Sequence, residues 1–131
     1  METFINHCKE GDIVSAKALY YNNINTNIIN TKSIYEGFSE SCSWGHLDIA
    51  IWLYDVSNKT INIHNNKDEI FFFAAILNQL SVVKWLYDLG GFDVLLRSDI
   101  IYAICYERGH HDMIKWLTNK YSNISINKQS L

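Results

Sequence analysis

The sequence predicts an all-α fold, a solenoid of about four helix–turn–helix repeats that forms a single domain over residues 1–131. A pattern of about 33 residues recurs four times along the 131-residue chain, which is typical of repeat architectures. Apolar residues inside each copy follow the spacing of a helix face. Proline, which interrupts helices, is absent from the chain. The expected repeats span roughly residues 2–34, 35–67, 68–98 and 99–131.

Three positions of the repeat move together along the chain. They are a leading aromatic residue (Phe4, Phe38, Phe71, Tyr102), a turn residue (Gly11, Gly45, Asn78, Gly109) and the residue seven positions after the turn (Ala18, Trp52, Trp85, Trp116). Each set advances by 34, 33 and then 31 residues. Because one such unit cannot bury its apolar stripe alone, stacked neighbours are expected to share a continuous core.

The first helix of each unit is expected to be short, about seven residues as at 38–44, and to end at the turn residue. Glycine adopts the left-handed conformation that often ends a helix, and the asparagine at position 78 is the next most tolerant residue type. Small residues late in this helix allow neighbouring helices to approach closely; they are Cys8, Cys42, Ala74, Ala75 and Cys105.

The second helix is expected to begin just after the turn. Asp48, Ser81 and Asp112 fall in or beside its first turn, where polar groups meet unpaired backbone N–H groups. Ile49, Trp52 and Leu53 lie on one face at helical spacing. The units are joined by asparagine-rich connectors that we expect to form short extended turns, at residues 24–27, 61–64, 92–95 and 124–127.

Charge and composition exclude several kinds of partner. The net charge is −3, so the chain lacks the positive field that binding to nucleic acid or to an anionic membrane requires. The longest apolar run, residues 70–77, is far short of the roughly 20 residues that span a bilayer. No basic start followed by an apolar stretch is present, so we expect the protein to remain inside a cell, with its three cysteines reduced.

The motifs Gly45-His46-Leu47-Asp48-Ile49-Ala50 and Gly109-His110-His111-Asp112-Met113-Ile114-Lys115 resemble the ankyrin repeat. The resemblance covers roughly residues 2–127. The chain departs from the family where ankyrin repeats usually carry Thr-Pro-Leu-His, as at Glu36-Gly37-Phe38-Ser39. The Lys84-Trp85-Leu86-Tyr87 ending, with the bias toward asparagine and isoleucine, is similar to ankyrin proteins of giant, mimivirus-type DNA viruses.

The resemblance implies a non-catalytic module that binds a protein through a concave face and its connector tips. We expect a monomer with no cofactor, no metal and no small-molecule substrate, acting on host factors in the host cytoplasm. The alternative is a structural or packaged component of a virus particle. An enzyme of unrecognised type is disfavoured, because no convergent set of titratable groups is visible.

The same resemblance places the candidate binding residues in two sets. The first set precedes the turns and comprises Ser43, Trp44, Ile76, Leu77, Glu107 and Arg108. The second set occupies the connector tips and comprises Ile34, Tyr35, Lys67, Asp68, Arg97, Ser98 and Asp99. Trp44 is the expected hot spot, and Ile76 with Leu77 could extend an apolar patch. The alternative is that Trp44 or Ile76 packs against a neighbouring unit.

Other chemically suggestive residues favour structural roles. Cys105, His110 and His111 lack the paired ligand spacing of a zinc site. The resemblance gives His46 and His110 a hydrogen bond to neighbouring backbone. The three cysteines are expected to be buried thiols. The recurring tryptophans are expected to pack in the core, since a base-stacking platform also needs a basic groove.

Overall fold

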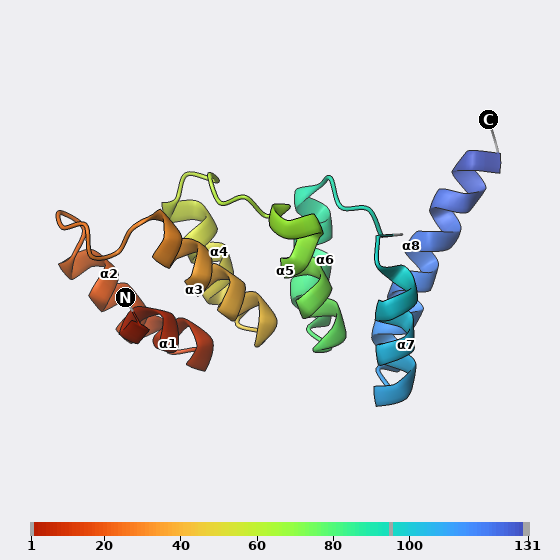
Figure 1. Ribbon diagram of the computed structural model, residues 1–131, viewed down its shortest axis with the longest axis horizontal. Helices are drawn as coiled ribbons and strands as arrows, with labels where there is room; N and C mark the ends of the chain where they lie inside the picture. The colour runs from red at the N-terminus through yellow and green to blue at the C-terminus, as the bar shows by residue number, and fades with distance from the viewer. Residues whose placement is uncertain (1, 95, 130–131) are drawn as a thin grey trace.

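The computed structural model describes residues 2–94 and 96–129, with side chains for 3–94 and 96–122. Within this part of the chain the fold is all-α, with eight helices and no strand (Figure 1). The helices are α1 (Glu2–Glu10), α2 (Ile13–Asn22), α3 (Thr31–Ser43), α4 (Leu47–Val56), α5 (Asn65–Ile76), α6 (Leu80–Leu89), α7 (Ser98–Arg108) and α8 (His111–Gln129).

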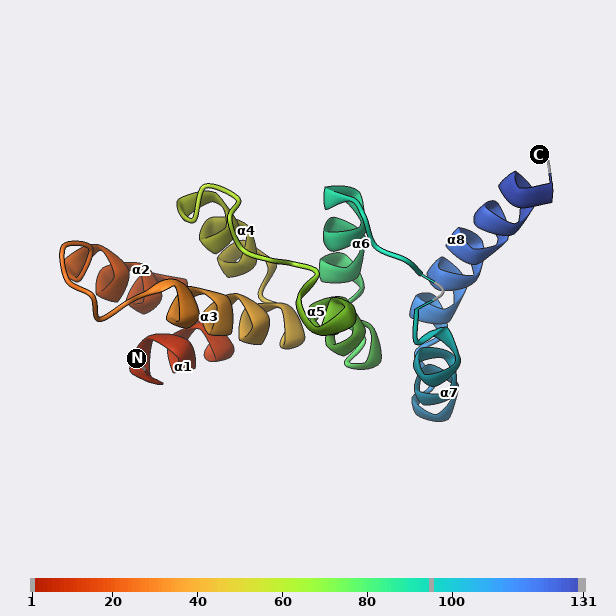
Figure 2. The ribbon, with the colours of Figure 1, turned by 45° about the horizontal axis from the view of Figure 1, so that its top comes forward.

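Consecutive helices form four pairs that follow one another along the long axis of the molecule (Figures 1 and 2). The odd-numbered helices contact one another in sequence, α1 with α3, α3 with α5, and α5 with α7. Tight turns join the two helices of each pair along one edge of the molecule, and the longer connectors between pairs lie along the opposite edge (Figure 1). Each pair therefore packs mainly on its sequence neighbours.

The four tight turns share one backbone geometry. Gly11, Gly45, Asn78 and Gly109 have φ values of 82°, 81°, 65° and 71°. At the second turn the N–H of Gly45 donates to Cys42 at 3.4 Å, and the N–H of His46 donates to Ser41 at 2.8 Å. The same two bonds recur at the other three turns. They satisfy the last carbonyl groups of the first helix, and they confirm the predicted left-handed turn residues.

The core follows the repeat as well. Phe4, Phe38 and Phe71 are buried at the leading aromatic position, and Tyr102 is half-buried. All five predicted small residues are fully buried: Cys8, Cys42, Ala74, Ala75 and Cys105. Between α5 and α7 the Cys105 Sγ lies 3.8 Å from the Ala75 carbonyl oxygen. Small side chains at these positions therefore let the odd-numbered helices pack closely.

The three recurring tryptophans have matching surroundings. Each packs edge-to-face on a tyrosine of the preceding even-numbered helix, in the pairs Tyr20–Trp52, Tyr54–Trp85 and Tyr87–Trp116. The ring centroids are 5.4, 5.8 and 5.3 Å apart, with interplanar angles of 83°, 88° and 90°. The tryptophans are half-buried and pack against the core, so one aromatic contact is repeated at three successive junctions.

The first helices begin earlier than predicted. Helix α3 starts at Thr31, where the backbone N–H of Ser33 donates to the Asn30 side chain at 3.0 Å. This cap extends the helix beyond the predicted seven-residue span at 38–44. The boundaries predicted after residues 34, 67 and 98 therefore fall inside α3, α5 and α7.

Three of the connectors differ from the predicted extended turns; of the other, predicted at 92–95, position 95 lies outside the described residues. Residues 23–29 and 57–64 are mainly turns and bends, and several residues there or just beyond are left-handed, including Asn58, Lys59 and Asn66, with φ of 54°, 60° and 51°. Residues 124–127, the predicted fourth connector, belong to helix α8. No glycine or proline occurs between His111 and Gln129, so nothing in this segment interrupts the helix.

Candidate interaction face

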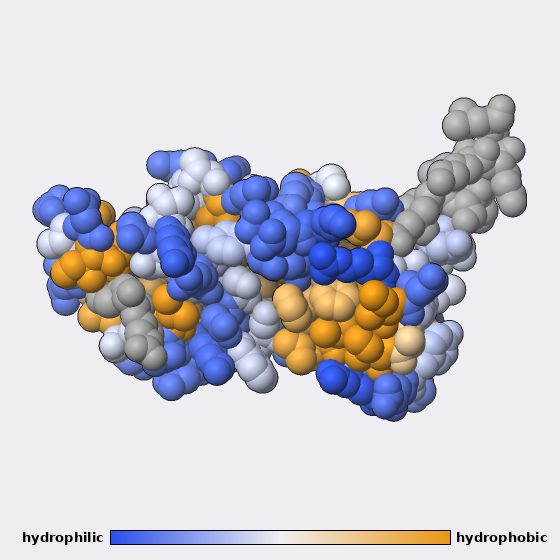
Figure 3. All heavy atoms as spheres, in the orientation of Figure 1, coloured by the Kyte–Doolittle hydropathy of each residue, from blue (hydrophilic) through white to orange (hydrophobic). Residues whose placement is uncertain are grey.

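The odd-numbered helices present a continuous side of the molecule, here called the odd-helix face (Figures 1 and 2). Its chemistry changes along the row. Hydrophilic side chains cover the region of α3, whereas hydrophobic side chains gather over α5 and α7 (Figure 3). The face is therefore asymmetric, although the helices beneath it repeat.

We define the α5–α7 patch as five apolar residues that are exposed or half-buried on these helices: Phe72, Phe73 and Ile76 of α5, with Ile100 and Ile104 of α7. Phe73 is 42% exposed and Ile100 is 52% exposed, and the other three side chains are half-buried. The rings of Phe72 and Phe73 meet edge-to-face at 5.4 Å. Contiguous exposed apolar surface on a folded chain commonly marks a binding site.

Two arginines border the patch at the two ends of α7. The guanidinium of Arg97 lies 5.0 Å from the Phe72 ring centroid and donates to the Asn66 carbonyl at 3.0 Å. The guanidinium of Arg108 donates to the Ile76 carbonyl at 3.3 Å. Each contact uses part of the guanidinium, and the remaining donors of these planar groups can meet a carboxylate.

Side chains from each unit hold the end of the preceding first helix. The His46 ring donates to the Lys9 carbonyl at 2.8 Å, and the Gln79 amide donates to the Ser43 carbonyl at 3.1 Å. Lys9, Ser43 and Ile76 all lie two residues before a turn. The bond from Arg108 to Ile76 therefore continues the same series. These bonds hold the C-terminal ends of α1, α3 and α5 against the neighbouring units.

The predicted backbone bond of the Gly-His motif is confirmed at His46 but not at His110. In the last unit Arg108 takes the equivalent carbonyl. The Nδ1 atom of His110 is buried and has no hydrogen-bond partner among the residues whose side chains are described. The neighbouring arginine can reach further than the imidazole, so the same carbonyl is satisfied by a different residue.

Trp44 is exposed, as a binding residue would be, and it also packs against a neighbouring unit, which was the alternative. The indole is 48% exposed, and its Nε1 donates to the Glu40 carboxylate at 2.9 Å. The Lys9 ammonium of the preceding unit lies 5.6 Å from the ring centroid. Trp44 therefore has an exposed ring edge and also contacts its neighbour. Ser43, Ile76 and Leu77 are half-buried beside the turns, and Glu107 and Arg108 are exposed.

The residues predicted at connector tips lie at helix starts instead. Tyr35 lies within α3, where its hydroxyl donates to Glu69 at 2.8 Å and accepts from the Asn65 amide at 3.2 Å. Burial raises the pKa of Tyr35. This residue therefore links α3 to α5 and is not a free tip; Ile34 beside it is also half-buried in α3.

The other predicted tip residues flank α5 and α7. Lys67 and Asp68 lie in the first turn of α5 with left-handed φ values of 56° and 62°. The Asp68 carboxylate is 2.6 Å from the His64 ring. That ring packs in a tilted arrangement against Phe92 of the next connector, with 4.4 Å between the ring centroids. Arg97 occupies the N-cap position of α7 without a side-chain capping bond, and the helix begins with Ser98 and Asp99. Lys67 and Asp99 are exposed, whereas Asp68, Arg97 and Ser98 are half-buried.

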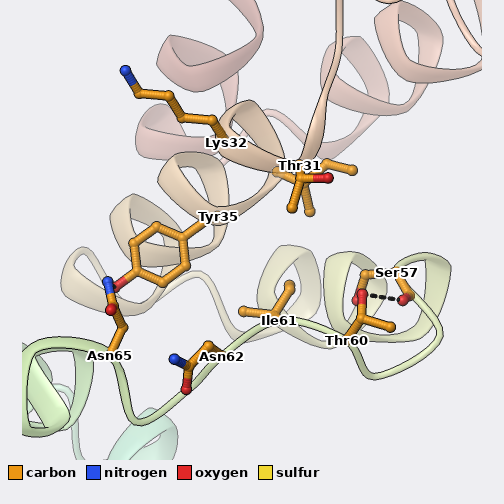
Figure 4. Close-up of a pocket in the computed structure, with 9 residues that line it drawn as sticks. Thr31, Lys32, Tyr35, Ser57, Thr60, Ile61, Asn62 and Asn65 are labelled. Carbon is orange, nitrogen blue, oxygen red and sulfur yellow. Dashed lines mark hydrogen bonds between the residues drawn. The ribbon is translucent and has the colours of Figure 1, made fainter.

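A cavity of about 550 Å³ opens between the start of α3 and the connector from α4 to α5 (Figure 4). Ile61 and the Tyr35 ring line its middle, and the Thr60 hydroxyl donates to the Ser57 carbonyl at 2.6 Å on one side. Lys32 extends away from the cavity (Figure 4). The polar groups at this site are thus largely engaged within the chain, and no charged group converges on its interior.

The buried thiols are chemically quiet. Burial raises the pKa of Cys8 to about 12 and also raises the pKa of Cys42 and of Cys105. Such thiols stay protonated at neutral pH and are poor nucleophiles. Across residues 3–94 and 96–122, no group of three His, Cys, Asp or Glu side chains could hold a metal ion.

Sequence reasoning missed Phe72, Phe73, Ile100 and Ile104, which form most of the α5–α7 patch. The signal was present in the run Phe71-Phe72-Phe73. A helix that buries one stripe cannot turn three successive side chains into the core, so with Phe71 inside, at least one neighbour must face outward. Ile100 beside the buried Ile101 follows the same logic.

No family model matches the chain, and the searches of curated proteins and of solved structures also gave no match. In the part of the chain that the structure describes, no helix combines the length and the apolar character needed to cross a membrane.

Proposed function

We propose that this chain is a non-catalytic protein-interaction module of the ankyrin type. The observation that carries the proposal is the exposed α5–α7 patch on a row of packed helices. Such a preformed surface loses little conformational entropy when a partner docks. The shared turn geometry and the repeated Tyr–Trp contacts support the assignment to the ankyrin type, since they give successive units the same local structure.

The partner is a protein of the cell in which the chain acts, and the resemblance to giant-virus ankyrin proteins makes this a host protein. The binding surface combines the α5–α7 patch with the exposed edge of Trp44. Trp44 precedes the second turn and the patch spans the third and fourth units, so the surface covers most of the row.

Affinity purification from the native or infected cell tests the proposal. The tagged chain is compared with an Ile100→Asp variant and with a matched Val14→Asp control, because Val14 is 76% exposed on α2 and lies outside the patch. We expect the Val14→Asp control to retain the captured protein and the Ile100→Asp variant to lose it. Capture of the same proteins in the same amounts by all three would contradict the proposal.

A further inference from the structure

Cationic side chains at the two ends of the α5–α7 patch indicate what kind of ligand it binds. It is a strip of five apolar side chains on two neighbouring helices, and it ends at a cationic group on both sides. Hydrophilic side chains border the hydrophobic surface above and below it (Figure 3). A ligand that covers the strip therefore meets positive charge at each end.

The distance between the two cationic ends of the patch follows from the length of α7. The helix has 11 residues, and at about 1.5 Å per residue its ends are about 16 Å apart. Arg97 and Arg108 both lean toward α5, one over Phe72 and the other at the Ile76 carbonyl. The span between the two cations therefore corresponds to about three turns of a helix in the ligand.

The charge at the two ends is unequal. At the Arg97 end, the exposed Lys67 follows Asn66, the residue that accepts the Arg97 hydrogen bond. The nearby Asp68 carboxylate contacts the His64 ring. At the other end, the exposed Glu107 adjoins Arg108 and offsets part of its charge. The exposed Asp99 in the first turn of α7 offsets part of the charge at the Arg97 end in the same way. Lys67 and Arg97 therefore face one exposed acid at that end, whereas Arg108 alone faces Glu107 at the other. The stronger electrostatic contact is expected at the Arg97 and Lys67 end.

We infer that the α5–α7 patch binds an amphipathic helix of a partner protein that carries acidic residues at both ends of its apolar stripe. The apolar stripe packs on Phe73, Ile76, Ile100 and their neighbours, and the acids meet Lys67 with Arg97 at one end and Arg108 at the other. A helix laid in an apolar groove is a recurring mode of peptide recognition, and the bordering cations set the orientation of the helix. This inference rests on the proposed function.

A pair of designed peptides tests this inference with the purified full chain. One fluorescent helical peptide of about 18 residues carries a leucine stripe between two glutamates about 11 positions apart, to match the length of α7. The second has lysines in place of the glutamates. Fluorescence anisotropy measures both affinities for the unaltered chain and for the Lys67→Glu, Arg108→Glu and Ile100→Asp variants.

The control for Lys67→Glu is Lys59→Glu, because Lys59 is also an exposed lysine at a left-handed position, with φ of 60° against 56° for Lys67. We expect the glutamate peptide to bind about tenfold more tightly than the lysine peptide. The double variant Lys67→Glu with Arg108→Glu should reverse this preference. Ile100→Asp should abolish binding of both peptides, while Lys59→Glu should leave both affinities unchanged.

Three outcomes would overturn the inference. Equal binding of the two peptides shows an apolar docking surface without the acidic requirement, which leaves the proposed function intact. A dimer of the chain that Ile100→Asp dissociates, with neither peptide bound, shows that the patch pairs with a second copy. Binding that survives Ile100→Asp shows that the peptides dock elsewhere. The proposed function fails separately, if Ile100→Asp leaves capture of the cellular partner unchanged.

Discussion

The Trp44 side chain is exposed to solvent and is also held in place by contacts within the chain. Its indole N–H is held by Glu40 and its ring lies beneath the Lys9 ammonium, yet about half of the side chain is exposed. A ring that is already oriented loses little rotamer freedom on binding. Tryptophan also contributes more binding energy than most residues when its exposed edge is covered by a partner.

We expect Trp44→Ala to weaken partner binding by more than ~1 kcal/mol. The fold should be unaffected, because Trp44 is not part of the buried core. Titration calorimetry with the captured partner measures the first effect, and circular dichroism during heating measures the second. Equal affinities of the two proteins for the partner would remove Trp44 from the binding surface.

Asn78 tests the tight turns at the scale of one residue. Its φ of 65° is in the left-handed region, which costs an ordinary side chain about 1–2 kcal/mol. We expect Asn78→Ala to lower the free energy of unfolding by about 1 kcal/mol and Asn78→Gly to change it by only a few tenths. Urea unfolding of the three proteins measures the order of their stabilities. An alanine variant as stable as the glycine variant would contradict the assigned turn.

The turn residues were predictable from the sequence and the α5–α7 patch was not, for a physical reason. The left-handed conformation is a local requirement that glycine or asparagine meets, so Gly45 and Asn78 identify it without knowledge of the fold. Whether Phe73 or Ile100 faces outward depends on which stripe of α5 and α7 the neighbouring helices cover. Which stripe is covered depends on the tertiary packing of the helices. The predicted first helix of about seven residues was also too short to include Ile100.

At the scale of helices, the aromatic contacts join neighbouring even-numbered helices. The recurrence of the tryptophans was predictable, but their tyrosine partners were not, because the partner belongs to the preceding unit. Each tyrosine follows the tryptophan position of its own unit by two residues. The same offset at Tyr20, Tyr54 and Tyr87 therefore places an edge-to-face contact at three junctions.

We expect the Tyr54–Trp85 and Tyr87–Trp116 pairs to show similar coupling energies of about 0.5–1.5 kcal/mol, the range for aromatic pairs beyond their buried area. Double-mutant cycles with leucine at each position measure the coupling from urea unfolding. A control cycle on Tyr54 of α4 and Trp116 of α8, which belong to non-adjacent units and are not partners in either pair, should give a coupling near zero. Coupling at one junction and none at the other would contradict a shared packing unit.

The buried thiols of the odd-numbered helices make the free energy of unfolding depend on pH. The pKa of Cys8 is about 12 in the folded chain against 9.0 when exposed. Below pH 9 both states keep the proton, so the thiol contributes nothing to the pH dependence. Between pH 9 and 12 the unfolded state loses the proton while the folded state retains it, so the free energy of unfolding falls as pH rises.

We therefore expect the urea midpoint to fall between pH 8 and pH 10, and to fall less in a Cys8→Ala variant than in the unaltered chain. Lysine and tyrosine side chains titrate in the same range, and the comparison of the two proteins removes their common effect. An identical decline in both proteins would show that the Cys8 thiol is accessible to solvent in the folded state.

At the scale of the whole molecule, the account depends on a linear arrangement of units. Contacts run from each helix pair to its sequence neighbours (Figure 1), so the odd-helix face is as long as the row itself. A face of this length can bring Trp44 and the α5–α7 patch to one partner. If the same helices folded back on themselves, part of this face would be buried against the chain.

Small-angle X-ray scattering of the purified chain tests this arrangement directly. A compact chain of 131 residues has a radius of gyration of about 14 Å. We predict a value clearly above that figure, with a distribution of interatomic distances that has a long tail. A radius of gyration near 14 Å with a symmetric distribution would contradict the linear array, and with it the extended binding face.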